Sequence, residues 1–185
     1  AAPVSPDKFR RGVEVFGDVI CQCYGQAEAP MLISMLAPEV VSAAASGYKS
    51  ERLKSCGKVT SCTEVAILDD SGNVLSVGER GEICCRGPLV TLGYFEKPEA
   101  TAEARLYGWH HTGDVGYLDD DDYLYIVDRK KDMIVSGAEN IYPAEVENAL
   151  YDHADVAEVA VIGVPHERWG ETVMAMVVRA PEATV

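Results

Sequence analysis

Residues 128–147 read DRKKDMIVSGAENIYPAEVE, and this stretch decides how the C-terminal part of the chain is organised. Short apolar runs and frequent turns lie before Asp128, whereas the basic triplet Arg129-Lys130-Lys131 begins a segment of different composition. We therefore expect a boundary between two parts of the chain at Asp128, with 1–128 on one side and 133–185 on the other.

The segment after this boundary predicts a small α+β unit. Pro143 can begin a helix that runs to Asp152, because proline is tolerated in the first helical turn. Two apolar runs follow, 156–164 and 172–179, and each predicts a strand. The apolar positions of the helix repeat at helical spacing and predict a buried stripe: Val146, Ala149 and Leu150.

Residues 58–127 are typical of short strands separated by turns. Candidate strands cover 64–68, 74–77 and 81–86, and the first two flank a turn rich in Asp, Ser, Gly and Asn. This pattern predicts a small antiparallel sheet or barrel.

A hairpin with an acidic tip is expected further along this part of the chain. The segments 117–118 and 123–127 flank four consecutive aspartates, Asp119 to Asp122. A calcium loop is the alternative, but the run lacks the Asp-x-Asp-x-Asp-Gly spacing and the distant glutamate of such loops. We therefore interpret it as a solvated turn.

The N-terminal part contains an apolar run, residues 19–24, followed at once by Gly25. This order indicates a strand that leads into a loop, and loops at strand ends often carry functional residues. Residues 31–47 are apolar without a clear period, so that strand and helix both remain open for them.

The formal charge of −14 comes from 16 basic and 30 acidic residues. Such an excess of acid argues against a nucleic-acid surface or an anionic membrane patch. The sequence offers no leader-like segment and no apolar run long enough to span a bilayer, so we expect a cytoplasmic protein without a transmembrane segment.

The six cysteines show none of the spacings expected for a metal site. We expect them to be reduced and to serve as small buried apolar residues, with a metal site as the alternative. Alternation along a strand predicts that Cys84 and Cys85 point to opposite faces.

Five segments together resemble the adenylate-forming superfamily, and in particular its acyl-CoA synthetases. Residues 24–28 are similar to the family's Tyr-Gly-x-Thr-Glu, and 93–95 with 98–101 to its Gly-Tyr and Pro-Glu-Ala-Thr segment. Residues 109–114 resemble its Trp-x-x-Thr-Gly-Asp, and 128–147 resemble its hinge with the following loop and helix. The order and spacing of the segments agree with the family over nearly the whole chain.

The resemblance implies a fold of mixed α/β and α+β class. Residues 1–128 would be the end of the large adenylation domain, including a small antiparallel β-barrel-like subdomain. Residues 129–132 would be the hinge, and 133–185 a truncated small α+β C-terminal domain. The implied reaction joins a carboxylic acid to ATP, giving acyl-AMP and pyrophosphate, and then transfers the acyl group to coenzyme A with release of AMP.

The resemblance also assigns roles in nucleotide and metal binding. Glu28 would coordinate Mg²⁺, which prefers sparse carboxylate anchoring. Asp114 would accept hydrogen bonds from both ribose hydroxyls of ATP or AMP, and Arg129 would lie near the ribose or the phosphate. Tyr24 and Gly25 complete this expected nucleotide site.

A second group of residues would serve the thioester-forming step. Lys131 would be the residue about which the small domain rotates. The loop of Gly137, Ala138, Glu139 and Asn140 would then approach the coenzyme A, and Trp169 would border its path.

The sequence departs from the family in three respects. It has no Gly/Ser/Thr-rich phosphate loop, it has no lysine after Lys131, and Ala27 stands where the family usually has threonine. We therefore expect a fragment of a synthetase that is not fully active alone.

Two other functions remain open at this point. One is a non-catalytic nucleotide-binding or assembly module on the same scaffold, and the other is an amino-acid-activating domain. Exposed sheet edges in a fragment also predict self-association.

Overall fold

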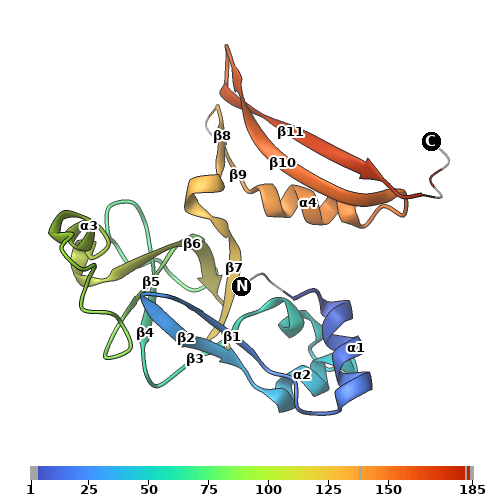
Figure 1. Ribbon diagram of the computed structural model, residues 1–185, viewed down its shortest axis with the longest axis horizontal. Coiled ribbons are helices and arrows are strands. Elements are labelled where there is room, and N and C mark those ends of the chain that lie inside the picture. Colours follow the sequence, from blue (N-terminus) through green and yellow to red (C-terminus); the bar gives the residue numbers. More distant parts are fainter. Residues whose placement is uncertain (1–3, 138, 182, 184–185) are drawn as a thin grey trace. The chain divides into compact units, whose positions relative to one another are not determined.

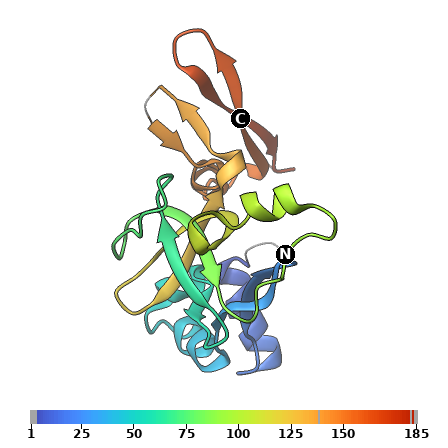
Figure 2. The same ribbon diagram turned by 90° about the vertical axis from the view of Figure 1, so that its left-hand side faces the viewer.

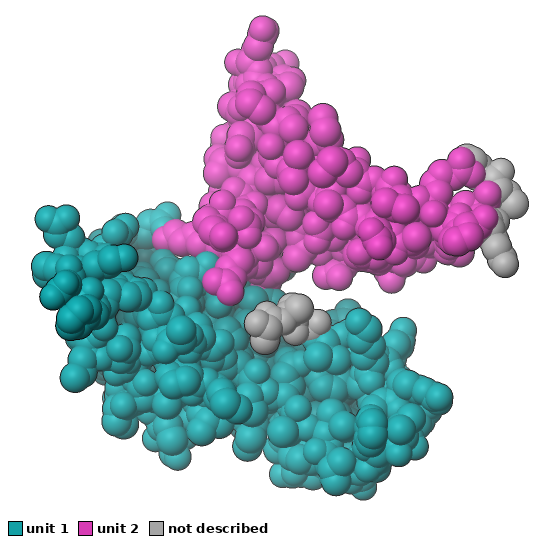
Figure 3. All heavy atoms as spheres, in the orientation of Figure 1, with its two compact units in different colours: residues 1–126 teal, residues 127–185 magenta. Residues whose placement is uncertain are grey.

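The structure, a computed structural model, describes residues 4–137, 139–181 and 183. The chain forms two compact units, residues 1–126 and residues 127–185, which Figure 3 distinguishes by colour. Each unit is described by itself. Among the described residues, no helix combines the length and the apolar character needed to cross a membrane.

The first unit begins with helix α1 (Pro6–Phe16), for which no helix was predicted. Its start follows local chemistry, because the Ser5 side chain accepts a hydrogen bond from the backbone N–H of Lys8 and Pro6 occupies the first turn. Residues 31–47, left open above, contain both kinds of element: strand β2 (Ala29–Leu36) and helix α2 (Pro38–Ala45).

Phe9 of α1 packs in a core cluster with Val41 and Ala44 of α2. The same cluster includes Leu36, which ends β2, and Tyr123, which begins β7. The two helices are thereby anchored beside one part of the sheet, and Figure 1 shows them next to each other.

A seven-stranded sheet forms the body of this unit, in the order β1-β2-β3-β7-β6-β5-β4. The strands not yet given are β1 (Gln22–Gln26), β3 (Gly57–Val59), β4 (Glu64–Leu68), β5 (Gly81–Arg86), β6 (His110–Leu118) and β7 (Tyr123–Arg129). The helix α3 (Pro98–Glu103) precedes β6, and Figure 2 shows it from a second side. The mixed class with antiparallel strand pairs is as expected from the sequence.

Two of the predicted strands, β4 and β5, have the expected bounds. The strand predicted over 74–77 is wrong, because only Val74 pairs there, in an isolated bridge with Leu68. The turn around Asp69 explains this, since the Asp69 carboxylate accepts backbone N–H groups of Ser71 and Asn73 and holds the chain in a tight loop.

Strands β6 and β7 are neighbours, as the predicted hairpin requires. At its tip, one oxygen of Asp119 accepts the backbone N–H groups of Asp121 and Tyr123 at 3.0 and 2.8 Å. Asp121 pairs with Lys49 at 2.8 Å and also with Arg52. The acidic run is therefore partly neutralised by cations from the segment after α2.

The cysteine prediction holds only in part. Cys84 and Cys85 are both buried and belong to different core clusters, which confirms that they face opposite sides of β5. Burial was wrong for Cys21 and Cys62, which are exposed because Cys21 precedes β1 and Cys62 lies in the turn before β4.

The second unit contains a four-stranded sheet in the order β10-β11-β8-β9. Its elements are β8 (Ile134–Ser136), β9 (Glu139–Ile141), α4 (Pro143–Tyr151), β10 (Val156–His166) and β11 (Gly170–Arg179). Helix α4 lies along β10 and β11 (Figure 1). The predicted helix and both predicted strands are confirmed, with the helix ending one residue earlier than expected.

The predicted buried stripe of α4 is wrong. Ala149 is exposed, Val146 and Leu150 are half-buried, and Pro143 is the buried residue of the helix. The reason is that α4 packs mainly against β10, and no second α-helix lies in the described part of this unit to cover its other sides.

Gly25 is required by the close approach of two backbone segments. The β1–β2 register shifts between Tyr24 and Gln26, and a Cβ placed on Gly25 would lie 2.4 Å from the nitrogen of Met31. No side chain fits at that distance, so the hairpin can close only around glycine.

We predict that Gly25→Ala lowers the free energy of unfolding by about 1–3 kcal/mol, since the added methyl group must push two backbones apart. Gly12→Ala is the matched control. Gly12 lies within α1, where alanine is favoured, and its added Cβ would lie at an ordinary contact distance of 3.5 Å from the Ile20 side chain. Urea unfolding of both variants checks this; equal midpoints would contradict the steric argument.

Candidate functional site

A buried hydrogen bond joins two of the predicted nucleotide-binding residues. The Tyr24 hydroxyl donates to Asp114 Oδ2 at 2.6 Å, and Asp114 is only 4% exposed. Burial, and then the neighbouring Asp114, raise the pKa of Tyr24 far above its ordinary value, so that Tyr24 is a protonated donor at any physiological pH.

This bond requires a strongly curved sheet. Three strands separate β1 from β6, which is about 19 Å on a flat sheet with ordinary strand spacing. A second side-chain contact joins the same strands, between Gln26 Nε2 and His110 Nε2 at 3.1 Å. The two contacts therefore show that the sheet curls so that β1 faces β6, in keeping with the barrel-like subdomain that was expected.

Asp114 is presented by a bulge in β6. Between the pairs Glu82↔Val115 and Cys84↔His111, β6 contains two more residues than β5, and Gly113 takes a φ of +73°. The Thr112 hydroxyl donates to the Ile83 carbonyl at 2.7 Å and accepts the Asp114 N–H at 3.1 Å. Glycine is suited to this backbone conformation, and threonine fixes the position of the aspartate that follows.

Glu28 lies in the turn between β1 and β2 and accepts a hydrogen bond from the Tyr94 hydroxyl at 2.8 Å. This bond lowers the pKa of Glu28, while partial burial acts in the opposite direction. The Glu28 carbonyl also accepts the Thr91 N–H at 2.7 Å. An ionised carboxylate held in a fixed turn is the chemistry that a magnesium ligand needs.

His110 belongs to the surroundings of Glu28. Burial lowers the pKa of His110, and the charge of Glu28 partly offsets this effect. A histidine with a lowered pKa stays neutral at physiological pH, so it does not compete with a cation for Glu28.

Tyr94 contacts the predicted magnesium ligand Glu28, and no role was expected for it from the sequence. The signal was present, because Tyr94 belongs to one of the segments that resemble the family, yet its partner Glu28 lies 66 positions away. The described contacts thus place Tyr24 with Asp114, and Glu28 with Tyr94 and His110.

In the second unit, Gly137 and Trp169 lie together. The Gly137 N–H donates to the Trp169 carbonyl at 2.8 Å, and a Cβ on Gly137 would lie 3.0 Å from the indole ring. Gly137 also has a φ of +67°. A side chain at this position would thus be both strained and in contact with Trp169.

Glu139 and Asn140 are exposed in β9, paired with Ser136 and Val135 of β8. The other loop residue expected to approach coenzyme A, Ala138, lies outside the described residues. Residues Gly137, Glu139, Asn140 and Trp169 therefore share one end of the four-stranded sheet.

Arg129 and Lys131 also belong to the second unit. Arg129 ends β7 and its side chain is exposed, and Lys131 lies exposed in a short 3₁₀ helix, Lys130–Asp132. The roles of both residues stay predictions, as do those of Tyr24, Gly25, Glu28, Asp114 and the loop around Gly137.

The chain thus combines a curled sheet that holds a buried Tyr-Asp pair with a separate small α+β unit. Residues 1–95 match the family described as AMP-binding enzyme, and residues 145–185 match the AMP-binding enzyme C-terminal domain. The chain therefore belongs to the AMP-binding enzyme family, within the adenylate-forming superfamily.

Curated relatives are CoA ligases. The chain is 44% identical to a medium/long-chain-fatty-acid–CoA ligase from Mycobacterium tuberculosis, covering 96% of this chain and 30% of that protein. It is 46% identical to a feruloyl-CoA synthase from Amycolatopsis, covering 97% of this chain and 35% of that protein. The chain thus spans about a third of the length of the curated relatives it matches.

Several solved structures are similar to the whole chain in fold and in sequence. An o-succinylbenzoate CoA synthetase from Bacillus subtilis, in complex with its acyl-adenylate intermediate, has a TM-score of 0.83 at 37% identity, covering 100% of this chain and 36% of that one. An amide bond synthetase from Marinactinospora thermotolerans has a TM-score of 0.85 at 39% identity, covering 99% and 36%. The B. subtilis synthetase has also been solved with ATP and a magnesium ion, at a TM-score of 0.79 and 37% identity, covering 96% and 35%.

We predict that Tyr94→Phe raises the pKa of Glu28, because the hydroxyl that holds it below the ordinary value of 4.5 is removed. A depressed pKa contributes stability above that ordinary value, and this contribution is lost as the pH falls through the folded pKa. The variant should therefore be slightly less stable than the unaltered chain at neutral pH. This difference in the free energy of unfolding should disappear as the pH falls through the folded pKa of Glu28. NMR titration of the Glu28 side-chain carboxyl checks this.

Tyr48→Phe is the control, since it removes the hydroxyl of an exposed tyrosine after α2. The titration of Glu28 should be the same in Tyr48→Phe as in the unaltered chain. An unchanged Glu28 pKa in Tyr94→Phe would show that the hydrogen bond does not control this carboxylate.

Proposed function

We propose that the chain is the AMP-binding part of an acyl-CoA ligase. The parent reaction would join a carboxylic acid to ATP, giving acyl-AMP and pyrophosphate, and then transfer the acyl group to coenzyme A. The observation that carries this proposal is the buried Tyr24–Asp114 pair within a chain whose curated relatives are CoA ligases.

The carboxylate of Asp114 would accept hydrogen bonds from the two ribose hydroxyls. Two acceptor oxygens suit a cis-diol, and hydrogen bonds to a charged group are worth about 1.5–3 kcal/mol each. Tyr24 already bonds one of these oxygens, so its role would be to fix the orientation of the carboxylate. Arg129 would contribute a cation near the ribose or the phosphate.

Glu28 would hold Mg²⁺, which offsets the repulsion between a carboxylate nucleophile and the triphosphate when bound. The lowered pKa of Glu28 supports this role, because a magnesium ligand must be ionised. Tyr94 would then orient the carboxylate. Gly25 would allow the β1–β2 turn to close and so position Glu28.

Residues 129–132 would act as the hinge between residues 1–128 and 133–185, with Lys131 as the turning point. Gly137, Glu139 and Asn140 would then come near the coenzyme A, and Trp169 would border its path. The contact between Gly137 and Trp169 supports a shared role for them. The chain alone would be inactive or nearly so, and the cytoplasmic location stays a prediction.

Transfer of the acyl group to an amine is a second candidate for the final step. The similarity to an amide bond synthetase favours it, although the curated relatives named above use coenzyme A. Both candidates share the adenylate site, so AMP binding tests the common part.

We predict that the chain binds AMP and that Asp114→Asn weakens this binding at least about tenfold, since one charged acceptor for the ribose becomes neutral. Isothermal titration calorimetry with AMP measures the affinity. Asp121→Asn is the control, because Asp121 is an exposed aspartate paired with Lys49 and should leave the affinity unchanged.

Absence of AMP binding by the unaltered chain would contradict the proposed nucleotide site. Equal affinities in Asp114→Asn and the unaltered chain would show that the ribose is held elsewhere. Circular dichroism of each variant would establish that it is folded.

Self-association through an exposed strand edge is a further part of the proposal. In the described part of the second unit, β10 is an outer strand of eleven residues, and Ile162 on it is 42% exposed. The N–H groups of Val159 and Val161 already donate to Tyr151 and Glu147 of α4, so a second copy would pair with the rest of this edge.

We therefore predict concentration-dependent self-association that Ile162→Lys reduces, because a lysine on an edge strand opposes pairing. Size-exclusion chromatography with light scattering measures the mass over a concentration series. Val74→Lys, at an exposed valine of the first unit, should not change the mass. A monomer at every concentration would contradict the prediction.

A further inference from the structure

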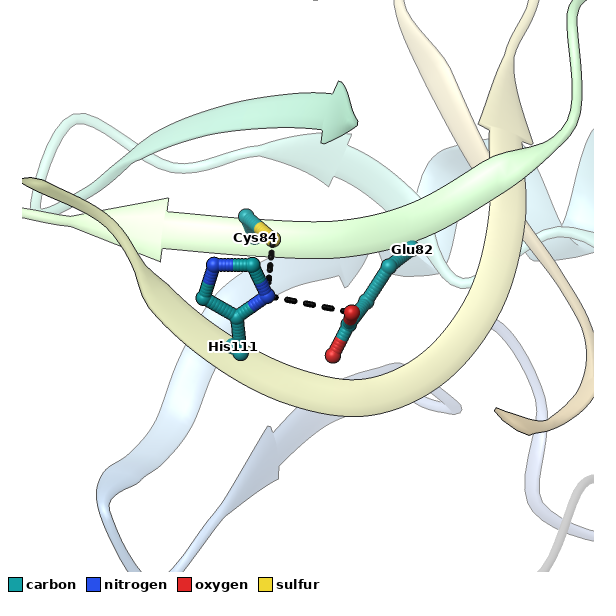
Figure 4. A group of neighbouring side chains, drawn as sticks. All are labelled: Glu82, Cys84 and His111. Carbon is teal, nitrogen blue, oxygen red and sulfur yellow. Dashed lines mark hydrogen bonds and ion pairs between the residues drawn. The ribbon is translucent and has the colours of Figure 1, made fainter. Parts of the chain in front are cut away.

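Three side chains with different ligand chemistry gather on one face of β5 and β6. Glu82 and Cys84 are two residues apart on β5 and so point to the same side, and His111 lies directly opposite Cys84 on β6. Figure 4 shows one ring nitrogen of His111 joined by dashed lines to the thiol and to the carboxylate. Glu82 and Cys84 are buried, and the His111 side chain is 14% exposed.

One atom, His111 Nδ1, faces both partners. It lies 3.5 Å from Cys84 Sγ and 3.0 Å from Glu82 Oε2. The three ligand atoms all lie within 4.8 Å of one another. In a tetrahedral zinc site with ordinary bond lengths, a sulfur and a nitrogen ligand are about 3.5 Å apart, and a nitrogen and an oxygen ligand about 3.3 Å. The distances from His111 Nδ1 to Cys84 Sγ and to Glu82 Oε2 are already close to these values.

Two of the three groups have outer partners of the kind that orient metal ligands. His111 Nε2 lies 3.2 Å from the Leu106 carbonyl, which can only accept a hydrogen bond. A proton on Nε2 leaves the lone pair of neutral Nδ1 directed at Cys84 and Glu82. On the other side, Glu82 Oε1 accepts the Gly113 N–H at 3.1 Å, which leaves Oε2 toward the histidine.

We propose that Glu82, Cys84 and His111 bind a divalent transition metal of the zinc class. Thiolate, imidazole and carboxylate together favour Zn²⁺ or Co²⁺ over Mg²⁺ or Ca²⁺. Binding replaces the thiol proton of Cys84, which passes to the solvent, and uses the neutral form of His111. Three protein ligands leave the fourth position of a tetrahedral metal to a water molecule. Ala66, Leu68 and Trp109 pack around Cys84 and make its side of the site apolar.

This site is distinct from Glu28, the predicted magnesium ligand, in both residues and ligand type. It is connected to the Thr112-Gly113-Asp114 bulge through the bond from Gly113 to Glu82. A bound metal would therefore fix the carboxylate that supports the bulge. The consequence is a higher unfolding temperature of the first unit, whether or not the chain binds a nucleotide.

Cobalt titration of the whole chain tests the site. The exposed or half-buried thiols are first removed as Cys21→Ser, Cys23→Ser and Cys62→Ser, so that they cannot bind the metal themselves. In this background, Co²⁺ should bind in a one-to-one ratio with a thiolate-to-cobalt charge-transfer band, and Zn²⁺ should displace it. Zn²⁺ should also raise the unfolding temperature.

Cys84→Ala should abolish the charge-transfer band, and Cys85→Ala should retain it. Cys85 is the matched control because it is equally buried on the same strand and faces the other core cluster. Glu82→Gln should weaken Co²⁺ binding by more than about tenfold while retaining the band at saturation. Circular dichroism would confirm that each variant is folded.

An ion pair between protonated His111 and Glu82 would give the same contacts without a metal. In that case Co²⁺ produces no charge-transfer band in the background chain, and the proposal is wrong. It is equally wrong if the band persists in Cys84→Ala. Because the readout is optical, neither result depends on AMP binding or on ligase activity.

Discussion

The buried hydrogen bond between Tyr24 and Asp114 constrains the whole first unit. A carboxylate that is almost removed from water needs partners that replace its hydration. Tyr24 can supply one of them only if β1 is brought opposite β6, across three intervening strands. The curl of the sheet, the closure of the β1–β2 turn around Gly25 and the position of Glu28 all depend on this arrangement.

The bulge in β6 changes which residues of β5 lie opposite those of β6. It directs Asp114 to Tyr24 and leaves His111 opposite Cys84 on another part of the strand pair. His111 and Asp114 are three residues apart, so alternation places them on opposite faces, and the two extra residues of the bulge change their position along β5 but not the face. Gly113 supplies the positive φ and Thr112 fastens the bulge to β5. The short Thr-Gly-Asp motif thus serves the fold and the candidate site together.

Local pattern was sufficient for some elements and insufficient for the contacts that matter at the site. β4 and β5 were predicted with their bounds because turn residues flank apolar runs, and α4 because a proline precedes helical spacing. The burial of side chains on α4 was less predictable, because it depends on which other elements pack against the helix. Ala149 is exposed because none of the described elements covers its side of α4. The Glu28–Tyr94 and Cys84–His111 contacts join residues far apart in sequence, so no spacing rule reveals them.

Asp128 shows how the resemblance and the geometry can be combined. Its carboxylate accepts the Arg129 N–H at 2.7 Å and the Ala144 N–H at 2.9 Å, and so ties the segment before the predicted hinge to the first turn of α4. A rotation about Lys131 would act inside the loop that this second bond closes. The rotation must therefore either break the hydrogen bond between Ala144 and Asp128 or move α4 together with Asp128. Breaking the bond would cost about 1.5–3 kcal/mol, because its acceptor is charged.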